Sequence, residues 1–463
     1  MRLHGFLIGQ TETLLADVLK FNGPADAATS RFFRAHPKLG HGERGVIAEA
    51  VFAVLRRRME FAHLAESGTG NPTRRLTLLG LMATAGRAAI RPFVSDAEAS
   101  WLEHVSKIDP ASLPLRQQLN LPDWIVKALE PRFNAAELAQ LAAALNYPAP
   151  LDLRANPIKA SREELLRALS QAGIEGGETP FAPFGVRVTG KPALSKLDSF
   201  KDGWFEVQDE GSQLLCTLLA PRRGEMVVDF CAGAGGKTLA LGAMMRSSGR
   251  LYAFDVSDKR LAKLKPRLAR SGLSNVNPVL IDSEHDAKIK RLIGKIDRVL
   301  VDAPCSGLGT LRRNPDLKWR QSPESIAELA PKQLSILTSA ARLLKRGGRL
   351  VYATCSILDA ENEAVVKQFL DTHPDFVLVP ARDVLAEQRV GLDTGDYFSL
   401  WPHRHATDGF FAAVLERRGD AQPKVKKAKA EATPDEAAAA SETADAIAKA
   451  QQPEAAEPDT AVE

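Results

Sequence analysis

The sequence predicts an α/β protein with a doubly wound, mainly parallel sheet, preceded by an all-helical region and a small α+β module. Apolar residues recur at helical spacing through about residue 145. A short stretch follows in which strand and helix patterns are mixed. From Glu210 onward, short apolar strands alternate with helical segments, and such repeated strand–helix units imply parallel strands.

The helical region is expected over residues 1–147. Ile47, Val51 and Leu55 belong to an apolar stripe at helical spacing, and the arginine triplet 56–58 lies partly off that stripe. We interpret the triplet as a solvated helix face rather than as a phosphate contact. No residue set in this region has catalytic chemistry, so the region offers no candidate reaction site.

The small α+β module is expected over residues 148–208, after a pair of prolines that breaks the helices. Residues 151–156 alternate apolar and polar side chains, as a half-buried strand does. Residues 161–173 form an amphipathic pattern that opens with serine and has glutamate three positions later, which is a capping box. Further strands are expected at 186–188 and 204–207.

The parallel sheet is expected within residues 209–418. Its strands are five apolar runs: 226–229, 250–255, 278–282 and the runs that end at Asp302 and Thr354. Residues 396–400 and 409–415 are expected to add a closing pair of strands. Ligands of open α/β sheets bind beyond the carboxyl ends of the strands, so the residues that end these strands are site candidates.

The loop after the first strand, residues 229–238, is rich in small residues that let backbone N–H groups approach a ligand at a helix N-terminus. A P-loop is excluded because Cys231 occupies the position of its first glycine. A dinucleotide loop is excluded because Thr238 occupies the position of its third glycine. A nucleoside loop of the methyltransferase type remains, with Asp255 at the next strand end placed to accept both ribose hydroxyls. The alternative is a plain tight turn.

A second constellation consists of Asp302, Cys305 and Cys355, which lie at or just after two strand ends. Carbon 5 of cytosine is a poor nucleophile until a thiolate adds at carbon 6. An acid must then satisfy the ring nitrogen, and a base must remove the carbon-5 proton before the thiol leaves. One carboxyl and two thiols meet these needs; buried, unreactive cysteines are the alternative.

These motifs resemble the Sun/RsmB-type family of RNA cytosine carbon-5 methyltransferases over about residues 148–416. The matching stretches are 208–212, 229–238, 302–309, 312–319, 353–356 and 408–411. The resemblance implies a Rossmann-like methyltransferase fold with S-adenosylmethionine as cofactor. It places the nucleophile on Cys355, the second, product-releasing thiol on Cys305, and a further site carboxylate on Asp302.

The resemblance also implies the cofactor contacts. These are Cys231, Ala232, Gly233, Ala234, Gly235, Gly236, Lys237, Asp255, Asp282 and Asp302. In one departure, this chain has Gly233 and Ala234 where the family usually has alanine and proline, which bears on the rigidity of the loop.

More weakly, the helical region resembles a NusB-like RNA-binding domain, and the small module stands where the family has an RNA-contacting extension. Small-subunit ribosomal RNA is therefore the expected substrate and transfer RNA the second choice. A catalytically silent RNA-binding assembly factor is an alternative, although neither cysteine is lost. An exocyclic-nitrogen methyltransferase would need a second proline and an aromatic residue after Asp302.

Composition and charge limit the remaining possibilities. Four cysteines without a Cys-x-x-Cys pair predict neither a disulfide scaffold nor a metal site, and hence a reducing, cytoplasmic location. No apolar run suggests a membrane span, and we expect a monomer. Residues 1–419 carry a net charge of +9 and residues 420–463 one of −5. We therefore expect electrostatic RNA binding, aided by the basic segment 312–320, and a disordered tail over 419–463.

Overall fold

The structure is a computed structural model that describes residues 3–419. Residues up to Arg418 form one compact unit. The expected disordered tail lies outside the described residues, apart from Gly419.

The N-terminal region is helical, as predicted. Its α-helices are α1 (Gly5–Val18), α2 (Ala25–Ala35), α3 (His41–Arg56), α4 (Arg58–Glu66), α5 (Pro72–Ala85), α6 (Arg87–Ile90), α7 (Asp96–Val105), α8 (Leu115–Leu119), α9 (Asp123–Leu129) and α10 (Ala135–Leu145). One core of apolar side chains joins Leu3 to Leu113. Residues 119–145 pack instead with Leu308, Ile326 and Trp401, on the α/β part of the chain.

The arginine triplet 56–58 is not a solvated helix face, so that interpretation is wrong. The apolar stripe is divided at Arg57, where the backbone leaves helical geometry between α3 and α4. Arg56 is only 8% exposed, and its Nη2 donates to the carbonyl oxygen of Arg312 at 3.1 Å. Arg58 lies over the rings of Phe21 and Trp319. Long-range packing, which the helical pattern does not contain, covers Arg56 and Arg58, whereas Arg57 stays partly exposed and pairs with Glu60.

The small module forms an antiparallel sheet in the order β2-β3-β1-β4, with β1 (Leu151–Ala155), β2 (Gly176–Glu178), β3 (Gly185–Val188) and β4 (Phe205–Val207). Helix α11 (Arg162–Gln171) and the short α12 (Asp198–Lys201) accompany it. The capping box is present: the Glu164 N–H donates to Ser161 Oγ at 3.1 Å, and the Ser161 N–H donates to Glu164 Oε2 at 2.7 Å.

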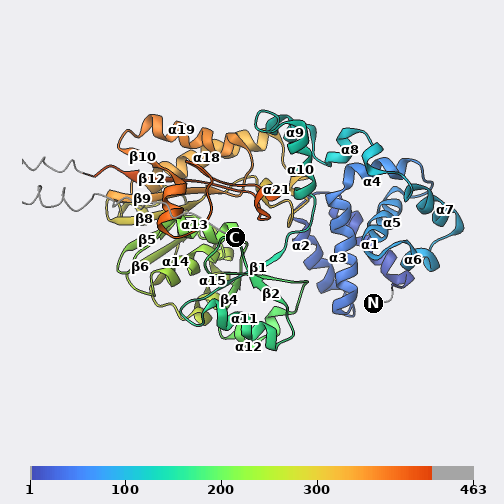
Figure 1. Ribbon diagram of the computed structural model, residues 1–463, viewed down its shortest axis with the longest axis horizontal. Coiled ribbons are helices and arrows are strands. Elements are labelled where there is room, and N and C mark those ends of the chain that lie inside the picture. The colour runs from blue at the N-terminus through green and yellow to red at the C-terminus, as the bar shows by residue number, and fades with distance from the viewer. Residues whose placement is uncertain (1–2, 420–463) are drawn as a thin grey trace, which may run out of the picture. The chain divides into compact units, whose positions relative to one another are not determined.

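The main sheet has the order β10-β12-β9-β8-β5-β6-β7, with β11 paired to β12 (Figure 1). Its strands are β5 (Met226–Asp229), β6 (Arg250–Asp255), β7 (Val276–Leu280), β8 (Ile296–Asp302), β9 (Leu344–Thr354), β10 (Phe376–Val379), β11 (Phe398–Leu400) and β12 (Phe410–Arg417). Strands β5 to β9 are parallel, and β10 to β12 pair antiparallel. The doubly wound fold and the closing strands are confirmed; β7 begins and ends two residues earlier than predicted.

Helices cover both faces of this sheet (Figure 1). The helices are α13 (Glu210–Leu219), α14 (Gly236–Met244), α15 (Asp258–Ser271), α16 (Ala287–Lys290), α17 (Leu317–Arg320), α18 (Pro323–Ala341), α19 (Glu363–Thr372), α20 (Ala381–Glu387) and α21 (Pro402–His405). Side chains of α18 and α19 share a core with one face, and those of α13, α14 and α20 share a core with the other. The carboxyl edge of the sheet stays available for a site.

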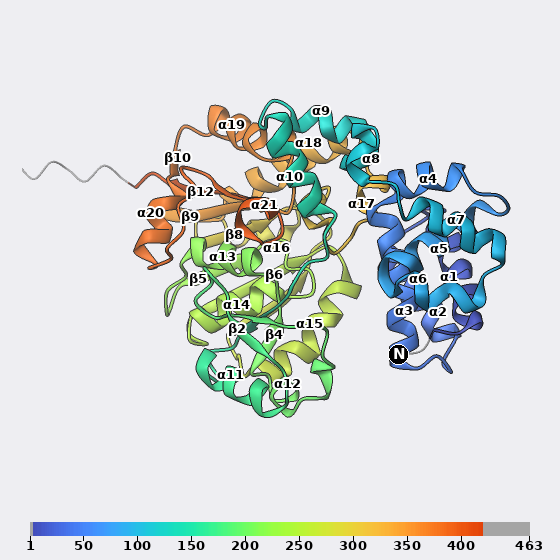
Figure 2. The same cartoon turned by 45° about the vertical axis from the view of Figure 1, so that its right-hand side comes forward.

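The basic segment 312–320 is largely buried between the helical and the α/β parts, where α17 lies in Figure 2. Lys318 is 1% exposed and donates to the carbonyl oxygens of Arg56 and Asn120 at 2.7 Å and to the side-chain oxygen of Asn146. The Trp319 indole N–H donates to the Leu55 carbonyl at 2.8 Å. Lys318 and Trp319 are thus part of an internal contact, and the segment is not the continuous exposed basic surface that its composition suggested.

Candidate active site

The site forms where the strand order reverses. Strands β5 and β8 are neighbours, and the chain continues outward from them in opposite directions. Asp229 and Asp302 end these two strands, and Asp255 ends β6 beside β5. Ligands of doubly wound sheets bind at this kind of switch point. The predicted strand-end carboxylates therefore lie along one edge.

The small-residue loop between β5 and α14 has the backbone geometry that a close ligand contact needs. Gly235 has φ +82°, and a Cβ there would lie 2.2 Å from Leu264 Cδ1. The guanidinium of Arg154 donates to the Gly236 carbonyl at 2.7 Å, and that of Arg267 donates to the Ala234 carbonyl at 2.6 Å. Sequence reasoning missed both arginines; they hold the loop that lacks the family's proline.

The carboxylate of Asp255 supports the loop and can also accept a hydrogen bond from a ligand. The carboxylate accepts the N–H groups of Gly233 at 2.8 Å and Ser257 at 2.7 Å, one on each oxygen. Arg260 Nη2 also lies 3.1 Å from Oδ1, so of the about four acceptor positions of a carboxylate one remains for a ribose hydroxyl. A Cβ at Gly233 would meet nothing within 4 Å, which leaves open space beside the loop.

The other strand-end carboxylates lie in different surroundings. Asp282 is exposed, two residues beyond β7, and its backbone N–H donates to Asp286. Asp229 is 1% exposed and accepts the Thr238 hydroxyl at 2.7 Å. Burial raises the pKa of Asp229 to about 7. Asp282 thus faces solvent, whereas Asp229 is enclosed.

Lys237 connects the cofactor loop to the second constellation. Its ammonium donates to Asp302 Oδ2 at 2.7 Å, with the two side chains 13% and 28% exposed. Burial would lower the pKa of Lys237, but Asp302 outweighs burial and raises it. Lys237 is also close enough to Cys355 to interact with it electrostatically. Lys237, a predicted cofactor contact, therefore lies between the cofactor loop and the constellation of Asp302 and the two thiols.

The two predicted thiols are in contact. Cys305 follows β8 and Cys355 follows β9, and these strands are parallel neighbours. The two sulfur atoms are 3.4 Å apart. The hydrogen bond with Cys355, together with burial, raises the pKa of Cys305 well above its usual value. Cys305 therefore holds its proton more tightly than a free cysteine does.

Close backbone contact makes this pairing possible. The Gly309 N–H donates to the Cys355 carbonyl at 2.8 Å, and the Gly409 N–H donates to the Gly309 carbonyl at 2.8 Å. A Cβ at Gly309 would lie 2.1 Å from the Gly409 carbonyl oxygen, so only glycine fits there.

Glu361 joins the two thiol loops, and sequence reasoning missed it. Its fully buried carboxylate accepts the Ser306 N–H at 2.8 Å, the Ser306 hydroxyl at 2.6 Å and the hydroxyl of Ser356. Gln333 adds a further donor at 3.0 Å. Ser306 and Ser356 each follow one of the two cysteines. The only available signal was a glutamate six residues after Cys355.

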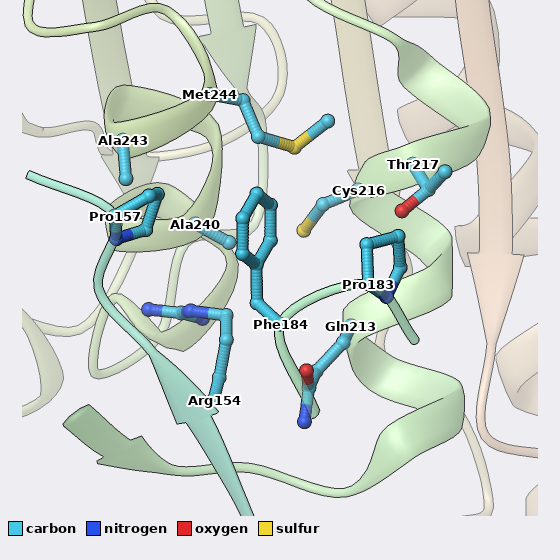
Figure 3. Close-up of a pocket in the computed structure, with 10 residues that line it drawn as sticks. All are labelled: Arg154, Pro157, Pro183, Phe184, Gln213, Cys216, Thr217, Ala240, Ala243 and Met244. Carbon is cyan, nitrogen blue, oxygen red and sulfur yellow. The ribbon is translucent and has the colours of Figure 1, made fainter. Parts of the chain in front are cut away.

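The other two cysteines belong to different surroundings. Cys216, on α13, lines a small cavity with Phe184 and Met244 (Figure 3), and burial raises its pKa to about 12. Burial also raises the pKa of Cys231, in the cofactor loop. Both thiols therefore stay protonated at neutral pH.

Two negative findings hold for residues 3–419. None of the helices there combines the length and the apolar character needed to cross a membrane. In the same part of the chain, no three His, Cys, Asp or Glu side chains gather as the ligands of a metal ion would.

Two family models match the chain. Residues 216–416 match the model described as 16S rRNA methyltransferase RsmB/F. Residues 121–194 match the ferredoxin-like domain of RsmF/B-like methyltransferases. The second match begins before residue 148, and the expected domain boundaries stay predictions.

Curated relatives extend the similarity along the chain. A Synechocystis sp. protein named probable ribosomal RNA small subunit methyltransferase B is 34% identical over 437 residues, which cover 87% of this chain and 98% of that protein. A Bacillus subtilis protein of the same name is 29% identical, with 82% of this chain and 92% of that protein covered.

Solved structures share the fold. The crystal structure of PH0851 has a TM-score of 0.72 and 27% identity, and the match covers 90% of this chain and all of that one. A methyltransferase homolog protein from Pyrococcus horikoshii has a TM-score of 0.56 and 28% identity, with 67% of this chain and all of that one covered.

Proposed function

Because the chain belongs to the RsmB/F family of 16S rRNA methyltransferases, we propose that it methylates carbon 5 of a cytosine in small-subunit ribosomal RNA. The observation that carries this proposal is the pair of thiols, Cys305 and Cys355, in contact beside Asp302 and Lys237. Methylation of an exocyclic nitrogen has no use for two thiols. Carbon-5 chemistry uses both.

S-adenosylmethionine is the cofactor, and the loop residues fit it. Asp255 keeps one acceptor position for a ribose hydroxyl, Gly233 leaves open space, and the N-terminus of α14 follows the loop directly. When bound, the cofactor supplies the methyl group that carbon 5 receives. The assignment of residues 231–237, Asp282 and Asp302 as contacts is part of the proposal.

In this mechanism Cys355 forms the bond to carbon 6. The sulfur lone pair adds to the ring, and the electrons of the carbon 5–carbon 6 double bond become available at carbon 5. Cys305, 3.4 Å away, keeps its own proton at this step, and the proton of Cys355 leaves to solvent as its sulfur attacks. The Lys237–Asp302 pair is the proposed proton source for the ring nitrogen.

Release needs a base. Cys305 first loses its own proton to solvent and then accepts the carbon-5 proton, and the electron pair of the carbon 5–hydrogen bond reforms the ring double bond. The carbon 6–sulfur bond then breaks, and its electrons return to Cys355. Because the two sulfur atoms are 3.4 Å apart, both thiols reach the same base.

Exchange of each thiol in turn tests the proposal. Cys355→Ala is expected to abolish methylation of unmodified small-subunit rRNA and to form no covalent adduct. Cys305→Ala is expected to accumulate a protein–RNA complex that resists a denaturing gel. A complex in Cys355→Ala and none in Cys305→Ala would assign the nucleophile to Cys305 instead.

The substrate is tested in the same assay. We expect 5-methylcytosine in small-subunit rRNA and none in transfer RNA offered at equal concentration, with sites mapped by bisulfite sequencing. Methylation of transfer RNA alone would make transfer RNA the substrate. The expected monomer and cytoplasmic location stay predictions.

A further inference from the structure

A cavity of about 270 Å³ lies where the helical part, the small module and the α/β part meet. Glu49, Phe52 and Arg56 of α3 line it, together with Lys191 and Arg312. Arg312 comes from the connection that also carries Cys305. The cavity is thus built from three regions far apart in sequence.

Two of its arginines are buried without a counterion. Arg56 is 8% exposed and Arg312 is 7% exposed, and neither forms an ion pair with a carboxylate of the described residues. Their hydrogen-bond partners are neutral. Arg56 donates to the Arg312 carbonyl, and Arg312 Nη1 donates to the carbonyls of Ala406 and Thr407 at 2.9 Å each.

Both guanidinium groups have donors to spare. The Nε atoms of Arg56 and Arg312 are buried and make no hydrogen bond among the described residues. Burial lowers the pKa of both arginines, and the attraction of Glu49 for Arg56 and of Asp408 and Asp209 for Arg312 offsets burial only in part. Buried Lys318 adds a further charge near Arg56, and its partners too are neutral oxygens.

The neighbouring Arg313, in contrast, has two carboxylates as counterions. It donates to Asp408 at 2.6 Å and to Asp209 at 3.0 Å. These two carboxylates are also the acidic groups closest in effect to Arg312, but they are bonded to Arg313. At the rim, exposed Lys191 pairs with Glu49. Glu49 acts on Arg56 without an ion pair between them, so both buried guanidinium groups lack a bonded counterion, which an anionic ligand would supply.

We propose that this cavity binds a phosphate group of the RNA backbone, held by Arg56 and Arg312 with Lys191 at the rim. The inference rests on the proposed function, which makes RNA the substrate. Guanidinium forks match phosphate oxygens in geometry and charge. The volume exceeds one phosphate and admits part of the adjoining sugar. Because Arg312 follows Cys305 by seven residues, the contact ties the RNA to the reacting loop.

The test measures RNA affinity against salt. Arg56→Gln is expected to weaken binding of unmodified small-subunit rRNA about tenfold and to reduce the slope of log affinity against log salt by about 1, as loss of one phosphate contact does. Lys191→Gln, at an exposed position, is expected to change both in the same direction by less. Arg223→Gln, exposed and outside the cavity, is the matched control and keeps the wild-type slope.

Two further measurements separate the possible failures. Calorimetry with S-adenosylmethionine should give wild-type affinity in every variant, which shows an intact α/β part. If the wild type makes 5-methylcytosine but Arg56→Gln and Lys191→Gln keep the wild-type slope and affinity, the phosphate site is wrong. If the wild type makes no 5-methylcytosine in RNA, the proposed function fails, whatever the slopes are.

Discussion

Residues 302–309 and 312–320 follow each other in one connection between β8 and α18, and the fold uses them in opposite ways. The first segment keeps its polar groups at the edge of the sheet, where Cys305 meets Cys355 and Asp302 meets Lys237. The second segment turns Lys318 and Trp319 inward against the helical part. Residues 302–309 carry the candidate reactive groups, and residues 312–320 pack against the helical part.

The difference teaches that residue type indicates function only together with position. Cys305 follows a strand of a parallel sheet, and the fold class alone places it at the ligand edge. Lys318 has no such position, and its charge suggested a surface. It is buried because three oxygens, from residues at the ends of three helices, match the three N–H groups of an ammonium.

The largest effect is expected at Lys318. Lys318→Met should lower the free energy of unfolding by about 4 kcal/mol, because it leaves three buried acceptors without a donor. Burial, together with the nearby charge of Arg56, lowers the pKa of this lysine. Urea unfolding measures the change, with exposed Lys290→Met as control. A loss as small as that of the control would mean that Lys318 is exposed to solvent rather than buried.

Next comes Glu361, which holds both thiol loops. Glu361→Ala should lower the methylation rate about 100-fold, because loss of the link lets the two thiols move apart. Glu361→Gln keeps the shape of the side chain and should lose less. Single-turnover methylation at saturating RNA measures the effect. An unchanged rate in Glu361→Ala would show that the thiol pair does not depend on this carboxylate.

A smaller effect concerns the buried acid of the catalytic edge. Asp229 has a pKa of about 7 in the folded protein, above its usual value of 3.8, because of burial. The folded state therefore holds the proton more tightly between about pH 4 and pH 7. The free energy of unfolding should therefore fall as pH rises through that window.

The substitution Asp229→Asn isolates the contribution of this carboxyl group to the pH dependence of stability. The amide oxygen still accepts the Thr238 hydroxyl, but the side chain no longer titrates. The difference in unfolding free energy between wild type and Asp229→Asn should vary between pH 4 and 7 and stay level above pH 7. A difference that does not vary with pH would mean that Asp229 keeps its usual pKa.

The smallest effect is expected at Trp319. Trp319→Phe removes the hydrogen bond to the Leu55 carbonyl and keeps an aromatic ring under Arg58. The free energy of unfolding should fall by about 1 kcal/mol, the usual net value of one such bond. Thermal unfolding measures it. A loss near that of Lys318→Met would mean that packing, not the hydrogen bond, dominates this contact.

The sequence by itself determined the fold class and the edge of the sheet at which the candidate residues lie. Apolar runs of strand length, alternating with helical patterns, are local signals. Each of Asp229, Asp255 and Asp302 closes such a run, so the fold class places all three along one edge. The cysteine after each of the strands β8 and β9 follows from the same reasoning.

Only the tertiary structure decided which charges are buried and which groups join the two thiols. Glu361 links loops that begin about fifty residues apart in sequence, and Lys318 reaches partners 172 to 262 residues away. The helical pattern predicts that Arg56 faces solvent, whereas in the folded protein its side chain is buried. A hydrogen-bond partner is set by distance in space, and no local pattern contains it, because packing between distant elements decides which polar group loses its water.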